Sequence, residues 1–382
     1  MKNKIQEKFV QLFGDLKGVR LFFSPGRVNI IGEHIDYNGG YVMPCAIDRG
    51  TFFAVRFNGT DKVNLYSLQF EDLGLVSFDV HNETKNKTYA DFVKGIIKIF
   101  DIHKGFDMVC GGTIPHSSGL SSSASFCTGL GFALSTLNGH PIAHTELALL
   151  CKRVENEFMG VNSGIMDQFI IANGIENGAL LLDCNTLKYE EIPFELGDYT
   201  LVIANTNKRR LLADSKYNER RSECDKVMEI LEKNGHHYKY LCDIDEKKFE
   251  ELLPLIEDEK LQRRFKHVVS ENIRTIKASK ALKAGHIEDL GAFLTASHMS
   301  LKNDYEVTGK ELDTLVFTFL SCNGCIGARM TGAGFGGCSI AIIKKGYEKQ
   351  AIEKVKETYT KEIGYEPSFY EVKVAGGTRE IK

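Results

Sequence analysis

The sequence has no long apolar run and no signal-peptide pattern. A membrane-spanning helix requires about 18 uninterrupted apolar residues, and no segment approaches this length. The first residues, MKNKIQEKFVQLFGDL, alternate charge with apolar side chains at helical spacing and lack the apolar core of a signal peptide. We therefore expect a cytoplasmic protein with no membrane partner.

Charge of one sign is also scarce, because 48 basic residues nearly balance 51 acidic ones and leave a formal charge of −3. No basic run is interleaved with aromatic residues, so the sequence lacks the usual footprint of a nucleic-acid-binding protein. Internal repeats and low-complexity tracts are absent as well. A chain of 382 residues, 43% of them hydrophobic, suits a globular protein of two or three domains, for which we expect a monomer.

The ten cysteines lack the spacing of a metal site, and most lie inside apolar patterns, as reduced buried thiols do. The one CxxC motif, Cys322 to Cys325, has no second pair at zinc spacing. Because Asn323 and Gly324 end an apolar helical pattern, we interpret this motif as a helix end rather than a redox or metal site.

Strand and helix patterns alternate in the first half of the chain, and charge-rich helices dominate the second. We expect strands at Arg20–Ser24, Thr51–Phe57, Ala179–Asp183, Thr200–Thr206, Cys338–Lys345 and Tyr370–Val374. Beyond the helix discussed below, we expect helices at Thr145–Phe158, Asp214–Lys233, Lys247–Leu320 and Tyr347–Ile363. A domain boundary is expected near Gly197.

The segment GLSSSAS, Gly119 to Ser125, has the composition of a linker but runs into a helical pattern. The apolar residues of one helical face follow it: Phe126, Leu130, Ala133, Leu134 and Leu137. The serines therefore lie at a helix N-terminus, where unpaired N–H groups suit an anion such as phosphate. A single serine also suffices as an N-cap, so a phosphate site and a simple cap both remain possible at this point.

Two further segments concentrate polar residues. The stretch SPGRVNIIGEHIDYNGG, Ser24 to Gly40, alternates charges with glycines and isoleucines, which favours a binding loop over a solvated face. In the second, VENEFMGVNSGIMDQF, Glu155 borders the apolar face of a helix and can either extend to water or reach a metal. Asp167 lies among glycines, where aspartate serves as a turn or cap residue or as a base.

A fourth segment, GARMTGAGFGGCSIAII, is rich in glycine. Gly332, Gly334 and Gly337 satisfy G-x-G-x-x-G, but the dinucleotide fingerprint requires a helix after the loop, and here a strand follows. We therefore reject a dinucleotide site and expect a tight glycine turn that joins a helix to a strand. The P-loop and the protein-kinase motifs are absent.

Taken in order, these four segments resemble the GHMP small-molecule kinases and, among them, the galactokinases. The motifs that carry the resemblance are GRVNIIGEHIDYNGGYVMPCAID, GLSSSAS, ENEFMGVNSGIMDQF and GARMTGAGFGGC, with DSKYNERRSECD and SLKNDYEVTGKELD in support. Two departures are visible: Ile35 stands where many relatives have threonine, and Ser117 where we expect a more compact residue.

The resemblance implies an α+β fold of two domains, a ribosomal-protein-like mixed α/β domain over residues 1–197 and a ferredoxin-like C-terminal domain over 198–382, with the active site between them. It also implies ATP-dependent phosphorylation of the anomeric hydroxyl of galactose, with Mg²⁺. The implied residues are catalytic Asp167 and Arg27; sugar-binding Glu33, His34, Asp36 and Tyr217; phosphate-binding Gly119, Leu120, Ser121, Ser122, Ser123, Ala124 and Ser125; and magnesium ligands Ser123 and Glu155.

These roles agree with the chemistry of phosphoryl transfer, which needs positioning and charge stabilisation more than covalent catalysis. Asp167 would accept the proton of the sugar hydroxyl or orient it, with Arg27 beside it. Two alternatives remain from the sequence: a related kinase acting on another sugar such as N-acetylgalactosamine, and a sensor that binds sugar and ATP without turnover. The intact SSSA, Asp167 and Arg27 argue against the sensor.

Overall fold

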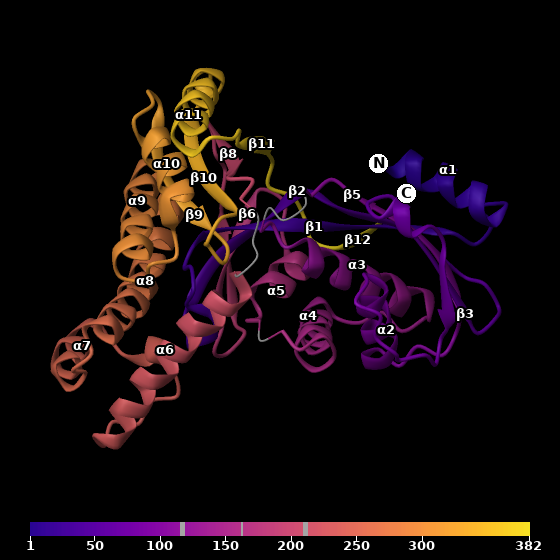
Figure 1. Ribbon diagram of the computed structural model, residues 1–382, viewed down its shortest axis with the longest axis horizontal. Coiled ribbons are helices and arrows are strands. Elements are labelled where there is room, and N and C mark those ends of the chain that lie inside the picture. Colours follow the sequence, from indigo (N-terminus) through magenta and orange to yellow (C-terminus); the bar gives the residue numbers. More distant parts are fainter. Residues whose placement is uncertain (115–118, 162, 209–212) are drawn as a thin grey trace.

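The computed structural model describes residues 1–114, 119–161, 163–208 and 213–382 (Figure 1). Ser117, one of the two departures noted above, lies outside the described residues. Within them, one larger and one smaller β-sheet organise the chain.

The larger sheet runs across the centre of the view in Figure 1. Its strands, in spatial order, are β12 (Arg379–Ile381), β1 (Arg20–Ile31), β2 (Tyr41–Phe57), β5 (Phe106–Gly112), β3 (Lys62–Ser67) and β4 (Val76–Asp79), while β6 (Gly178–Asp183) pairs with β2 and with β7 (Tyr189–Pro193). Neighbouring side chains on β1 alternate between its two faces, as a strand requires. Leu21 packs under one helix and Phe22 under another group of helices.

Helices cover both faces of this sheet. On one face lies α1 (Lys2–Phe13), whose Ile5 and Phe9 pack on Leu21. On the other face lie α2 (Ala90–Ile99), α3 (Ser122–Leu137), α4 (His144–Arg153) and α5 (Met166–Asn173), as Figure 1 shows. Most residues of α3 from Ala124 onward are buried, so the packing of this helix on the sheet determines where its N-terminus lies.

The smaller sheet has the order β11 (Ser368–Val372), β8 (Tyr199–Asn205), β10 (Cys338–Lys344) and β9 (Cys325–Thr331). One face packs on α10 (Gly309–Leu320) and α11 (Glu348–Ile363), through residues such as Val202 and Phe319. Its other face, with Leu201 and Ile340, shares a core with β1 and β2. The remaining helices are α6 (Ala213–Lys233), α7 (Glu246–Leu252), α8 (Glu259–Lys283) and α9 (Ile287–Asn303).

The prediction of a binding loop from Ser24 to Gly40 is wrong for the first half of that segment. Strand β1 continues through Pro25 and Gly26 to Ile31, and only the segment after Ile31 leaves the sheet. The pairing of β1 with β2 shifts register between Pro25 and Gly26 and again between Asn29 and Ile31. These irregularities allow proline and glycine, which usually signal a loop, to lie within a strand.

The glycine turn was also expected between a helix and a strand. The residues before it form β9, so the turn joins two antiparallel strands, β9 and β10. The expected helix to Phe158 is α-helical only to Arg153, and one π-helical turn follows at Val154–Met159. The strands expected at Arg20–Ser24 and Thr51–Phe57 are only parts of the longer β1 and β2. The other expected strands, α6 and α11 agree with the structure to within a few residues, while Lys247–Leu320 divides into α7 to α10.

The ends of the chain lie side by side at one end of the larger sheet (Figure 1), because β12 pairs with β1. The boundary near Gly197 stays a prediction, and β12 belongs with the first sheet in any division of the chain there. All ten cysteines are free. Among the described residues, no helix is both long and apolar enough to cross a membrane.

Candidate active site

Arg27 on β1 and Asp167 in the first turn of α5 form a two-pronged ion pair. Arg27 Nε donates to Asp167 Oδ1 at 2.8 Å, and Arg27 Nη2 donates to Oδ2 at 2.8 Å. Arg27 Nη1 donates to the carbonyl oxygen of Gly119 at 2.7 Å. The Arg27 side chain is only 6% exposed, whereas that of Asp167 is 30% exposed, so the carboxylate reaches solvent while its partner is fixed.

Ser121 lies at the N-cap position of α3 but does not cap the helix, since its side chain makes no hydrogen bond to the first turn. Instead its hydroxyl donates to Asp167 Oδ2. Its backbone is left-handed, with φ 60°, a conformation that costs energy for a residue with a side chain. The geometry therefore rejects the simple-cap interpretation and directs Ser121 to the Asp167 carboxylate.

A pocket of about 270 Å³ lies in front of this ion pair. We call it the acidic pocket; its walls include Arg27, Glu33, His34, Asp36, Gly119, Ser121, Ser123, Ser163, Gly164, Asp167, Tyr217 and Ala333. The structure thus brings together all six residues expected to be catalytic or to bind sugar. They come from β1, the loop after it, α5 and α6.

The acidic pocket shifts the pKa values of Asp36, Glu33 and His34. Burial, together with the charge of Asp167, raises the pKa of Asp36 to about 6. Burial raises the pKa of Glu33 as well, although Arg329 and Arg27 oppose the shift. Burial lowers the pKa of His34 to about 3, so this imidazole is neutral at physiological pH. The pocket is therefore rich in hydrogen-bond acceptors, which suits a neutral ligand with several hydroxyl groups.

Three residues that hold the pocket together have no assigned role in the sequence reading. Arg329 on β9 forms a fully buried ion pair with Glu33. The ring of His34 is bound on both sides, with Nδ1 2.9 Å from Tyr37 Oη and Nε2 3.2 Å from the carbonyl oxygen of Ala333. Tyr37 Oη lies 2.9 Å from Tyr305 Oη in turn. Arg329, Tyr37 and Tyr305 all lie inside segments that carry the family resemblance, and this was the signal available in the sequence.

The N-terminus of α3 presents the exposed residues Ser122 and Ser123. Leu120 and Ala124 have buried side chains and can contribute only backbone groups. Ser125 does not belong to an anion site: its hydroxyl is buried and donates to the carbonyl oxygen of Ser24 at 2.8 Å, and its N–H bonds the carbonyl of Ser121. Both donors of Ser125 are used within the fold, so we remove it from the expected phosphate-binding set.

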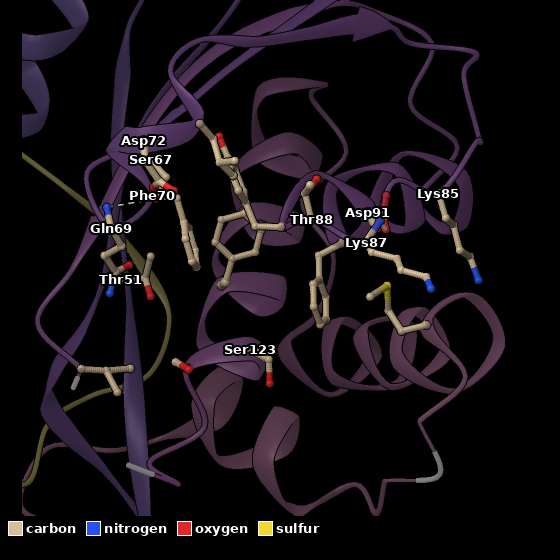
Figure 2. Close-up of a pocket in the computed structure, with 17 residues that line it drawn as sticks. Thr51, Ser67, Gln69, Phe70, Asp72, Lys85, Lys87, Thr88, Asp91 and Ser123 are labelled. Carbon is tan, nitrogen blue, oxygen red and sulfur yellow. Dashed lines mark hydrogen bonds between the residues drawn. The ribbon is translucent and has the colours of Figure 1, made fainter. Parts of the chain in front are cut away.

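A second, larger pocket of about 870 Å³ opens on the other side of the α3 N-terminus. We call it the aromatic pocket; it is lined by Thr51, Ser67, Gln69, Phe70, Asp72, Leu73, Lys85, Lys87, Thr88, Tyr89, Asp91, Phe92, Ile114, Ser122, Ser123, Phe126 and Met159. Figure 2 shows Ser123 on its helix, with Phe70 to one side and Lys85 and Lys87 to the other. Ser123 lines both pockets and so marks their junction.

Glu155 lies in the π-helical turn and is buried rather than extended to water. Its Oε2 accepts a hydrogen bond from Ser163 Oγ at 2.9 Å, and burial raises its pKa to about 7. Among the described residues no lysine or arginine forms an ion pair with this carboxylate. A buried carboxylate without a cationic partner is costly. Ser163, which binds Glu155, lines the acidic pocket together with Ser123, and carboxylate and hydroxyl oxygens are donors that suit Mg²⁺.

Models of known protein families match three parts of the chain. Residues 7–57 match the galactokinase galactose-binding signature, residues 90–174 the N-terminal domain of GHMP kinases, and residues 278–361 their C-terminal region. The matched parts contain the loop after β1, the α3 N-terminus, Asp167 and Arg329.

Relatives that match over their full length belong to the same family as the matched models. The chain is 47% identical to a galactokinase of Clostridium acetobutylicum and 48% identical to one of Clostridium beijerinckii, each comparison covering 99% of both chains. A crystal structure of Lactococcus lactis galactokinase complexed with galactose superposes with a TM-score of 0.96 at 44% identity, over 99% of both chains. A mevalonate kinase of Methanococcus jannaschii, at 22% identity and a TM-score of 0.66 over 93% of this chain and 98% of that one, shares the fold.

Proposed function

The chain belongs to the galactokinases of the GHMP kinase superfamily and phosphorylates galactose with ATP, and from this premise we propose how its own residues perform the reaction. Galactose occupies the acidic pocket, the adenosine part of ATP occupies the aromatic pocket, and the phosphates pass over the N-terminus of α3. The phosphoryl group goes to the anomeric hydroxyl, giving galactose 1-phosphate and ADP in the first step of galactose catabolism.

One observation carries this arrangement: the two pockets share Ser123. A nucleotide in the larger pocket can therefore direct its terminal phosphate into the smaller one. The N–H groups of the first helical turn and the exposed hydroxyls of Ser122 and Ser123 meet the phosphate chain at this junction. This supports phosphate binding by the α3 N-terminus over the alternative of a helix cap.

The aromatic pocket suits the base of a nucleotide. Phe70 and Tyr89 stack with ring centroids 5.4 Å apart and an angle of 8° between their planes. The buried hydroxyl of Tyr89 has no hydrogen-bond partner among the described residues, so it is available to a polar group of the nucleotide. Lys85 and Lys87 border the same pocket and add positive charge (Figure 2). An anionic ligand with a flat base matches this combination.

The residues that would hold Mg²⁺ in this proposal are Ser123 and Glu155, since Mg²⁺ needs few protein ligands. When bound, Mg²⁺ neutralises charge on the phosphates as it develops during transfer. The N–H groups at the N-terminus of α3 bind the phosphates in this arrangement. Ser163, which donates to Glu155, orients this carboxylate.

Asp167 receives the proton of the galactose O1 hydroxyl. As the bond between O1 and the γ-phosphorus forms, the bond from that phosphorus to its bridging oxygen breaks and ADP leaves; the O1 proton passes to the Asp167 carboxylate. Arg27 fixes both carboxylate oxygens, so that Asp167 is held ready at the pocket surface. Ser121 adds a third donor on the same carboxylate.

The remaining polar residues recognise the sugar. Glu33 and Asp36 are acceptors for sugar hydroxyls, and Tyr217 closes the pocket from α6. His34 acts through the shape of its ring, because both of its nitrogens are already hydrogen-bonded inside the protein. We refer to Gly32–Gly40 as the sugar loop. A site of this kind rejects an analogue whose hydroxyls are misplaced, because a buried acceptor then loses its partner.

A coupled ADP-release assay across a panel of sugars tests this proposal. We expect galactose to be the best common hexose and glucose, its C4 epimer, to be at least about 100-fold poorer in kcat/KM. The kcat/KM for N-acetylgalactosamine, which carries a larger group at C2, measures how much space the pocket leaves beside that position. Phosphorus NMR of the galactose product should place the phosphate on C1. Comparable kcat/KM for glucose, or phosphate on C6, would contradict the proposed geometry.

A further inference from the structure

The backbone at the start of the sugar loop is held by a carboxylate from a distant helix. Glu271 on α8 is completely buried, and its Oε1 lies 3.0 Å from the backbone N of Gly32 and 3.3 Å from that of Glu33. Ser297 Oγ on α9 donates to the same oxygen at 2.6 Å. One carboxylate oxygen therefore accepts both N–H groups at the point where the loop leaves β1.

A second side chain of α8 binds the carbonyl group of the same residue, Glu33. His267 is also completely buried, and its Nε2 lies 3.1 Å from the carbonyl oxygen of Glu33. Because a carbonyl oxygen only accepts hydrogen bonds, Nε2 carries the hydrogen. The side chain of Glu33 is bound by Arg329. The N–H, the carbonyl and the carboxylate of Glu33 thus each have a buried partner from α8 or β9.

The backbone of this segment needs such support. Gly32 has φ 96° and His34 has φ 61°, so two left-handed residues flank Glu33. A left-handed residue with a side chain costs energy and persists only where the surrounding structure determines it fully. Loss of the hydrogen bonds on Glu33 would let this turn relax, and both Glu33 and His34 would then move at the wall of the acidic pocket.

The charge of Glu271 is retained despite its burial. Burial opposes ionisation, but Arg274, one turn further along α8, together with His267 and Arg329, outweighs it and lowers the pKa of Glu271 to about 2. A charged acceptor makes a stronger hydrogen bond to a backbone N–H than a neutral one. An apolar side chain here would leave the N–H groups of Gly32 and Glu33 buried without an acceptor, which is costly, so galactose recognition has to be measured separately from stability.

We propose that Glu271 and His267 are positioning residues for galactose recognition, which fix the Gly32–Glu33 backbone and thereby the Glu33 carboxylate and the His34 ring. The inference rests on the proposed contact between Glu33 and the sugar. It predicts that changes on α8, which lines neither pocket, alter the affinity for galactose and leave that for ATP unchanged.

The test compares variants that remove or restore these hydrogen bonds. We expect Glu271→Met and His267→Leu to raise the galactose KM about tenfold, with the ATP KM within about twofold of the parent chain. Glu271→Gln keeps an acceptor oxygen and His267→Gln keeps an N–H donor, so both should recover most of the galactose affinity. Asn272→Ala is the matched control on α8, since Asn272 accepts the N–H of Tyr41 at 2.8 Å, beyond the sugar loop.

Thermal unfolding of each variant separates positioning from stability. We expect Asn272→Ala to lower Tm without changing the galactose KM. If Glu271→Met does not fold, His267→Leu and His267→Gln decide the question by the same comparison. An unchanged galactose KM in folded His267→Leu would overturn the inference, as would equal losses in the Leu and Gln variants. Glu33→Gln is measured in parallel: if it leaves the galactose KM unchanged, the proposed sugar contact fails instead.

Discussion

Arg27 binds Asp167 at both carboxylate oxygens, with two N–O distances of 2.8 Å. A lysine at this position could keep the charge but could not bind both oxygens at once, nor also reach the carbonyl of Gly119. The two-pronged ion pair therefore does more than balance charge, because it also fixes the direction in which the Asp167 carboxylate faces the acidic pocket.

We expect Arg27→Lys to lower kcat by about 10-fold to 100-fold, since misorientation of a catalytic group by a fraction of an ångström has effects of this order. Steady-state kinetics at saturating galactose and ATP measure the change. Arg20→Lys is the control, because Arg20 lies on the same strand and pairs with Glu380 at 2.6 Å far from the pocket. A kcat within twofold of the parent chain for Arg27→Lys would show that charge alone suffices.

Gly164 leaves room for Asp36. A Cβ atom at Gly164 would lie 1.7 Å from Asp36 Oδ2, so any side chain there must displace this carboxylate. We expect Gly164→Ala to raise the galactose KM about tenfold or more and to leave the ATP KM unchanged. The double variant with Asp36→Ala should be no worse than Asp36→Ala alone. Additive losses would show that Gly164 acts by another route.

Galactose affinity should depend on the ionisation of Asp36. Its pKa of about 6 means that the carboxylate is charged, and accepts sugar hydroxyls, above pH 6 and gains a proton below it. Affinity should therefore fall as the pH drops through about 6, by up to about tenfold per pH unit. His34 stays neutral over this range because its pKa is about 3. Calorimetric titration of the nucleotide-free protein between pH 5 and 8, a range that brackets the Asp36 pKa of about 6, measures the effect. Asp36→Asn should abolish it.

The proposed magnesium site is tested by Glu155→Gln, which removes the proposed carboxylate ligand and no proposed sugar contact. We expect the Mg²⁺ concentration for half-maximal rate to rise about tenfold or more, with galactose affinity nearly intact. Glu157→Gln is the control from the same π-helical turn, because Glu157 is exposed and pairs with Arg153 at 2.8 Å. An unchanged Mg²⁺ titration for Glu155→Gln would leave this buried carboxylate with a structural role only.

The sequence was sufficient for the family and for most residues that face the acidic pocket, but not for the aromatic pocket, of which only the serines of α3 were expected. Arg27, Asp167, Glu33, Asp36 and Ser123 lie in motifs whose order along the chain is distinctive, and the structure brings them together. In the proposed arrangement their side chains meet the ligands directly, so the residue type at each position is tied to the chemistry.

Residues that act on the backbone could not be found in this way. Glu271 accepts the N–H of a residue 239 positions earlier, and a hydrogen bond to a main-chain group leaves no trace in the identity of that residue. Ser125 shows the opposite failure: it continues the serine motif, yet it lies two residues beyond Ser123 on the helix, and its hydroxyl is directed into the core. Pro25 and Gly26 were assigned to a loop because strand irregularities have no reliable signal in a single sequence.

The catalytic role of Asp167 is tested by Asp167→Asn. The amide cannot take up the O1 proton, and general-base assistance is typically worth about 10²–10⁴ in rate, so kcat should fall by about that factor. Galactose affinity, measured by calorimetry, should change less, because the amide still contacts O1. One N–H of Arg27 then faces the amide nitrogen, so some loss of stability is expected, and Tm must be recorded alongside kcat.

Ser121→Ala provides the comparison, since it removes a hydrogen-bond donor to the Asp167 carboxylate and leaves the base in place. If Asp167 acts as the base, Ser121→Ala keeps most of the rate that Asp167→Asn loses. Equal losses in the two variants would mean that orientation of the hydroxyl, rather than proton uptake, limits turnover, and a fully active Asp167→Asn would remove Asp167 from the mechanism.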